Sequence, residues 1–117
     1  MKIERFEEII AWQKAQDLAV EIYSSFNKIK DYGFKDQICR AVVSGSNNIA
    51  EGFDRNTDAD FTRFLYISVA SCSEVRSMLY LAERLKYIDT KNRDKLINYC
   101  LEVSKITKGF IKSLRKN

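Results

Sequence analysis

Residues 58–85 read DADFTRFLYISVASCSEVRSMLYLAERL, and apolar or small side chains recur in this stretch every three or four positions. This interval matches the 3.6-residue turn of an α-helix, so the recurring side chains share one face. Thr57, three residues before Asp60, resembles an N-terminal capping box. Small side chains between Ser68 and Ser73 would let another helix approach closely. The stretch predicts a long helix whose inward face consists of Phe61, Phe64, Leu65, Ser68, Cys72, Val75, Met78, Leu79, Ala82 and Leu85.

The same spacing continues on both sides of this stretch. It predicts further helices over residues 6–29, 34–52 and 91–115, with Gly33 ending the first of them. Short connections between four helices make sequence neighbours antiparallel, and 117 residues suit a single domain. We therefore expect an all-α fold, an antiparallel up-and-down four-helix bundle that occupies residues 1–117 as one domain.

The composition excludes several classes of function. With Pro 0 and Gly 4 there is too little turn chemistry for a small β-sandwich or barrel. His 0 removes the usual general base near neutral pH, the Ser-His-Asp arrangement and most catalytic zinc sites. Cys39, Cys72 and Cys100 form no C-x-x-C pair and predict small core residues, with a reactive thiol as the less favoured alternative. We expect no enzymatic activity, no metal and no cofactor.

Hydropathy and charge point to a protein of the cytoplasm that meets a polyanion. No stretch approaches the roughly 20 apolar residues of a membrane span, so we expect no membrane contact. The net charge is +4, but residues 86–117 hold nine basic and three acidic residues, a net charge of +6. Solvated lysines on a helix are the alternative explanation for this excess. If the excess binds phosphates, the candidates are Lys95, Lys105, Lys108, Lys112, Arg115 and Lys116, with Arg40 and Arg55 as secondary candidates.

A strip of polar residues interrupts the helix predicted over residues 34–52. Intervals of three or four place these side chains on one side, where propensity alone would not select them. One interpretation is a hydrogen-bonded network inside the bundle or at a subunit contact; the others are a ligand-binding or RNA-contacting strip and, least favoured, a catalytic strip around Glu51. The candidate network consists of Arg40, Asn47, Asn48, Glu51 and Arg55.

Tyrosines are a second ambiguous group. We expect Tyr66, Tyr80 and Tyr87 on the third helix and Tyr99 on the fourth. Tyrosine is favoured at protein interfaces as well as in cores, so these positions indicate a possible contact surface.

Four short motifs together resemble a known family. They are F-E-x-I-x-A-W-Q-K-A at residues 6–15, Y-G-F-x-x-Q-I-x-R-A at 32–41, S-N-N-I-A-E-G-F-x-R at 46–55 and F-x-R-F-L at 61–65. In this order they resemble the 23S rRNA intervening-sequence proteins, over nearly the whole chain. One departure is that Gly45-Ser46-Asn47 stands where the family usually has a proline just before the third motif. The second helix is therefore expected to be less sharply kinked, or kinked by other means.

The resemblance implies a four-helix bundle that assembles into a ring, a homopentamer in members of this type. It also extends to the accessory variability protein of diversity-generating retroelements, a basic pentamer that binds a reverse transcriptase and nucleic acid. With the charge pattern, it leads us to expect a non-enzymatic oligomeric adaptor that binds RNA more readily than DNA. The alternative is a structural module whose ring docks a protein partner without binding nucleic acid.

Overall fold

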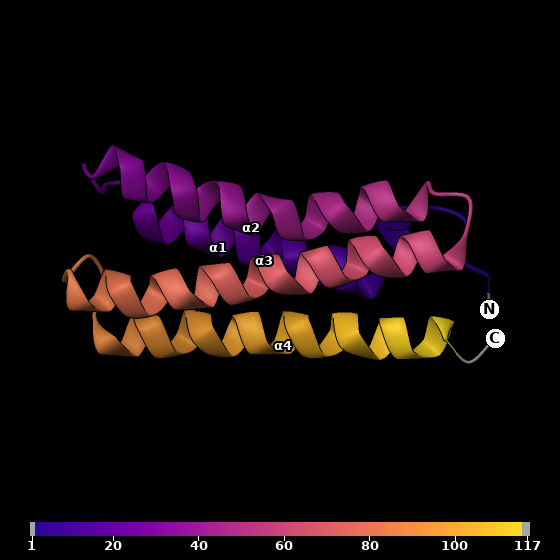
Figure 1. Ribbon diagram of the computed structural model, residues 1–117. Helices are drawn as coiled ribbons and strands as arrows, with labels where there is room; N and C mark the ends of the chain where they lie inside the picture. The colour runs from indigo at the N-terminus through magenta and orange to yellow at the C-terminus, as the bar shows by residue number, and fades with distance from the viewer. Residues whose placement is uncertain (1, 116–117) are drawn as a thin grey trace.

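A computed structural model describes residues 2–115 of the chain, and these residues contain helices and no strand. A short 3-10 helix, η1 (Phe6–Glu8), precedes four α-helices: α1 (Ile10–Phe26), α2 (Tyr32–Phe53), α3 (Asp58–Arg84) and α4 (Thr90–Leu114). The four α-helices run alternately up and down along one long axis (Figure 1). The predicted four-helix architecture is therefore confirmed.

Each α-helix packs against two others. The contacts join α1 to α2, α2 to α3, α3 to α4 and α4 back to α1, which closes the bundle. The molecule measures 46 × 22 × 19 Å along its principal axes, so its length is set by the helices themselves. In Figure 1 the α2–α3 connection lies at the same end as the start of α1 and the end of α4. None of the helices in residues 2–115 is long and apolar enough to cross a membrane.

The core lies along the bundle axis and comes from all four helices. Its largest fully buried side chains include Leu18 of α1, Ile38 of α2, Leu65 of α3 and Leu96 of α4. Buried hydroxyls in this core are hydrogen-bonded, as the cost of burying an unpaired polar group requires. Ser68 Oγ donates to the carbonyl of Gly45 at 2.8 Å, and Thr107 Oγ1 donates to the carbonyl of Val103 at 2.8 Å. The α2–α3 contact is therefore close at Ser68, as the small residues predict.

The first helix is shorter than the predicted 6–29. Ile9 is extended, with φ −76° and ψ 119°, and this residue separates the 3-10 turn from α1. Ile9 is only 2% exposed, so it packs in the core although its backbone is extended. The side-chain amide of Gln13 in α1 donates to the carbonyl of Glu7 in the 3-10 turn at 2.8 Å. The turn is thus held against α1 without being continuous with it.

The predicted role of Gly33 is also wrong. Gly33 lies in the first turn of α2 and has no left-handed φ, because Asp31 caps this helix earlier than expected by accepting from the amide of Phe34 at 3.1 Å. Among residues 2–115 the residue with a left-handed backbone is Lys86, with φ 64°, just after α3. Tyr87 consequently lies in the α3–α4 connection rather than on the third helix.

Candidate nucleic-acid interface

The candidate phosphate-binding side chains of α4 divide into two groups. Lys105, Lys108, Lys112 and Arg115 follow one another at intervals of three or four, so they share one side of the helix, and all four are exposed. None of them forms an ion pair with a residue between 2 and 115. We call these four residues the α4 basic strip. Lys116 lies outside the described residues.

Lys95 does not belong to this strip. Its Nζ lies 3.4 Å from Glu21 Oε1 of α1, so it faces the opposite neighbour of α4 and its charge has a partner. The pair is exposed and contributes little to stability. The structure thus separates Lys95 from the other predicted cations.

A tyrosine lies beside the α4 basic strip. Tyr66 of α3 is 49% exposed, and its hydroxyl lies 3.5 Å from Arg115 Nη1. A groove of about 330 Å³ between α3 and α4 is lined by Tyr66, Lys108, Ile111, Lys112 and Arg115. The sequence indicated Tyr66 as a contact residue, but its position next to these cations follows from the packing of the two helices.

The polar strip of α2 is divided between two environments. The side-chain amide of half-buried Asn48 donates to the carbonyl and hydroxyl oxygens of Ser44 at 2.8 and 2.9 Å, and Ser71 of α3 donates to the same hydroxyl at 2.8 Å. Arg40, Asn47 and Glu51 are exposed, and their side chains make no hydrogen bond within residues 2–115. The local network therefore joins Asn48 to Ser44, which belongs to the same predicted polar strip, and Ser44 to Ser71 of α3, which the sequence did not indicate.

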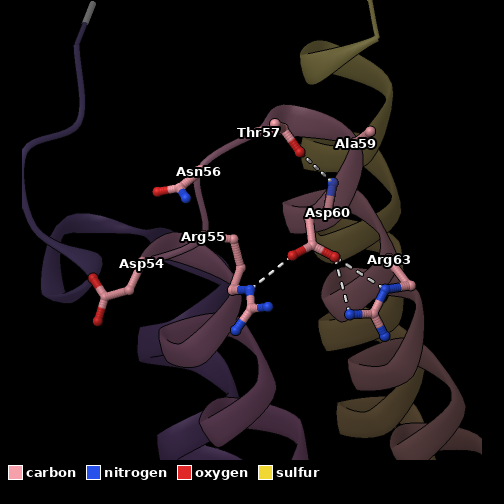
Figure 2. Close-up of a pocket in the computed structure, with 7 residues that line it drawn as sticks. All are labelled: Asp54, Arg55, Asn56, Thr57, Ala59, Asp60 and Arg63. Carbon is pink, nitrogen blue, oxygen red and sulfur yellow. Dashed lines mark hydrogen bonds and ion pairs between the residues drawn. The ribbon is translucent and has the colours of Figure 1, made fainter.

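Arg55, the last residue of the polar strip, has a partner that the sequence did not indicate. Its Nε donates to Asp60 Oδ2 at 2.7 Å, and Arg63 donates to Asp60 Oδ1 through Nε at 3.1 Å and Nη2 at 2.9 Å (Figure 2). Both guanidinium groups also lie over the ring of Phe64, with Cζ at 5.2 Å for Arg55 and 4.8 Å for Arg63. Only the sequence spacing of Asp60 and Arg63, three apart on a helix, signals part of this cluster.

The chemistry of this arginine pair is set by the carboxylate between them. Hydrogen bonds from Arg55 and then from Arg63 hold the pKa of Asp60 below its ordinary value of 3.8. In Figure 2 Asp60 points between the two arginines, whereas Asp54 and Asn56 point away from it around a hollow of about 710 Å³. Because the Asp60 carboxylate already binds both guanidinium groups, Arg55 is a weaker candidate for binding phosphate than the α4 basic strip, whose cations have no ion-pair partner within residues 2–115.

The three cysteines are buried and unpaired. Burial raises the pKa of all three thiols, that of Cys100 to about 12. The thiols are therefore protonated at neutral pH, as core residues are. Residues 2–115 contain no group of three or more acidic or thiol side chains that would hold a metal ion.

Comparison with known proteins identifies the family. The sequence profile described as 23S rRNA-intervening sequence protein matches residues 7–109, which include all four helices down to most of α4. The chain belongs to this family. The resemblance carried by the four sequence motifs is thus confirmed.

A solved structure agrees with the assignment to the 23S rRNA-intervening sequence family. A protein of unknown function from the S23 ribosomal protein family of Bacteroides thetaiotaomicron superposes with a TM-score of 0.81 at 28% sequence identity. The match covers 88% of this chain and 99% of the other, so the two bundles correspond almost end to end. No curated protein matches the sequence.

Proposed function

We propose that this member of the 23S rRNA-intervening sequence family is a non-enzymatic, cytoplasmic adaptor that binds RNA through the α4 basic strip. The observation that supports this proposal is the run of four exposed cations at Lys105, Lys108, Lys112 and Arg115 without an ion-pair partner between residues 2 and 115. Residues 103–117 contain no aspartate or glutamate. When such cations bind to a phosphate backbone, they displace the counterions condensed on the nucleic acid, and this release favours binding.

Stabilisation of the helix does not account for the whole strip. Cations near a helix C-terminus interact favourably with its dipole, but this effect is confined to about the last turn. Lys112 and Arg115 lie there, at the end of α4, whereas Lys105 and Lys108 lie one to two turns further in. The two inner lysines therefore favour an external anion over a role in capping the helix.

The proposed adaptor acts as an assembly of several copies, with five as the proposed number. The outward side of α3 carries the small residues Ala70, Ser73 and Ser77, flanked by exposed Ile67 and Leu81. Small side chains let a second helix approach closely, and covering exposed apolar residues favours association. Five copies would carry a net charge of five times +4, or +20, which strengthens polyanion binding through multivalency.

The binding proposal is tested by titrating structured ribosomal RNA with the purified protein and following fluorescence anisotropy at several salt concentrations. We expect affinity to fall with salt on a log–log plot and a variant with Lys105, Lys108, Lys112 and Arg115 changed to Ala to bind at least tenfold more weakly with a shallower slope. The matched control removes four exposed cations from the other end of the bundle, where α1 and α3 end and α4 begins, and should keep its affinity within about threefold: Lys28, Lys30, Arg84 and Lys91.

The second candidate function is a module whose ring docks a protein partner without binding nucleic acid. The exposed apolar side chains of α1, Val20 and Tyr23, favour it, because they lie outside the proposed subunit contact on α3 and such residues also suit a partner protein. Absence of RNA binding at low salt, with the assembly intact, would replace the RNA adaptor by this module. A different outcome, equal loss of RNA affinity in the strip variant and in its control, would show that the α4 basic strip is not the RNA-binding surface.

A further inference from the structure

The groove between α3 and α4 at the end of the α4 basic strip combines two kinds of ligand-binding group. Three cations, Lys108, Lys112 and Arg115, line it together with the exposed ring of Tyr66, and Ile111, 3% exposed, is the apolar member of the lining. Within residues 2–115 no carboxylate lines the groove. Its volume of about 330 Å³ is at the lower end of the range for small-ligand pockets, about 300–1,000 Å³.

The other exposed tyrosine of α3 provides an internal comparison. Tyr80 is 51% exposed and also has an arginine of α4 nearby, with Arg93 Cζ 5.7 Å from the ring centroid. Arg93, however, pairs with Asp94 at 2.8 Å and with Glu83 at 3.5 Å, so its charge is neutralised. Tyr66 is therefore distinguished from Tyr80 by the free cations beside it rather than by its exposure.

Phosphate binding alone does not require an exposed aromatic ring. A duplex offers its backbone to a basic surface while its bases remain stacked on one another, and so leaves the ring of Tyr66 without a partner. An unpaired nucleotide offers both a phosphate and a free base, and aromatic rings beside cations are the usual means of holding single strands. The composition of the groove matches the second ligand.

We propose that this groove holds an unpaired nucleotide of a single-stranded RNA segment, with the base stacked on Tyr66 and the adjoining phosphates on Lys108, Lys112 and Arg115. The inference rests on the proposed function and adds the form of RNA that the surface selects. The hydroxyl of Tyr66, 3.5 Å from Arg115 Nη1, orients the ring relative to the cation, whereas the ring itself supplies the stacking surface. Removing the ring should therefore matter far more than removing the hydroxyl.

The test compares two fluorescein-labelled RNAs of twelve nucleotides or base pairs, an unstructured single strand and a blunt duplex, at one fixed low salt concentration. Wild-type protein is expected to bind the single strand more tightly. Tyr66→Leu should weaken single-strand binding about tenfold and change duplex binding less than twofold, because one stacked base is lost. Tyr66→Phe should retain single-strand affinity. Tyr80→Leu, an equivalent change on the same helix, should behave as wild type.

The controls separate failure of this inference from failure of the proposed function. If both RNAs bind wild-type protein and the variant with the α4 basic strip changed to alanine loses them, but Tyr66→Leu binds the single strand like wild type, stacking on Tyr66 is wrong and the RNA adaptor stands. If Tyr66→Leu loses both RNAs equally, with its helical circular dichroism unchanged, the ring does not select unpaired bases. If neither RNA binds wild-type protein, both proposals fail.

Discussion

The lack of a side chain at Gly52 allows α2 and α3 to approach each other closely. A Cβ atom at this position would lie 2.6 Å from Cβ of Phe64 and 2.9 Å from Cδ1 of Phe61. The nearer atom is attached directly to the backbone of α3, so it moves only if the helix moves. A glycine at residue 52 is therefore required by the packing of the two helices, whichever ligand the protein binds.

Changing Gly52 to alanine is expected to destabilise the fold. Overpacking against the two phenylalanines costs about 1–3 kcal/mol, which exceeds the gain of up to about 1 kcal/mol in helix propensity. Gly109→Ala is the matched control, because Gly109 lies within α4 and its added Cβ would have no atom of residues 2–115 within 4 Å apart from its own stretch of helix. This variant should gain up to about 1 kcal/mol. Urea unfolding followed by circular dichroism measures both changes. Equal stabilisation of the two variants would contradict the close approach.

Asp60 links stability to pH at the start of α3. Its pKa is lowered in the folded protein by hydrogen bonds from Arg55 and Arg63, so its contribution to stability is present above its unfolded pKa of about 3.8 and is lost as the pH falls through the folded value. NMR titration of the Asp60 carboxyl carbon should give a pKa below 3.8, and changing both arginines to alanine should raise it toward 3.8. An unchanged pKa in the double variant would show that the arginines are not the cause.

At the scale of the helices, spacing predicts the interior of each helix better than its ends. The segments predicted over 58–85 and 91–115 correspond to Asp58–Arg84 and Thr90–Leu114, because their apolar residues repeat without interruption and Thr57 and Asp89 cap them. The predicted start of the first helix fails at Ile9, whose apolar side chain continues the pattern although its backbone is extended. Gly33 fails as a stop because the cap of Asp31, a local hydrogen bond, governs that turn.

In the candidate site too, sequence spacing predicts features within one helix but not contacts between helices. The α4 basic strip depends only on intervals along one helix, so sequence alone places Lys105, Lys108, Lys112 and Arg115 on one side. The approach of Tyr66 depends on how α3 packs on α4, which no interval within either helix specifies. The polar strip of α2 is divided for the same reason. Ser71 of α3 hydrogen-bonds to Ser44, whereas Asp60 at the start of α3 binds Arg55, and neither contact follows from intervals along α2.

The start of α3 allows a direct test of a predicted cap. Thr57 Oγ1 accepts from the amide of Asp60 at 3.1 Å, whereas the Asp60 carboxylate binds Arg55 and Arg63, so only one half of the capping box is used. Thr57→Ala should destabilise the protein by about 1 kcal/mol in urea unfolding, since it leaves an amide without its acceptor. Thr57→Ser should retain the stability. A serine variant as unstable as the alanine variant would assign the loss to the methyl group instead.

At the scale of the whole molecule, assembly and RNA binding are coupled in the proposed adaptor. Each subunit supplies one short basic strip, and a strip of four cations gives modest affinity by itself. Repeating the strip around a ring converts later contacts into intramolecular ones and raises the overall affinity without a new contact. A change that disperses the ring should therefore weaken RNA binding even when it lies far from the strip.

Leu81→Glu is the variant that separates assembly from the binding surface. Leu81 is 47% exposed on α3 and lies fifteen residues from Tyr66, about 22 Å along the helix. Light scattering after gel filtration should give wild-type protein a mass of about 68 kDa, five times the chain mass of 13.6 kDa, and Leu81→Glu the mass of a single chain. Burying an unpaired carboxylate at a subunit contact is what disfavours the ring.

RNA affinity of the dispersed variant then measures the contribution of multivalency. It should fall by at least tenfold, while helical circular dichroism remains that of wild type. Val20→Glu, which adds the same charge to the 66% exposed Val20 of α1, should keep both mass and affinity. If Leu81→Glu keeps the wild-type mass, the subunit contact does not lie on this side of α3. If the wild-type protein has a mass of 13.6 kDa, it is a monomer and the proposed ring is wrong. A dispersed variant with undiminished affinity would show that one strip is sufficient and that the ring serves another purpose.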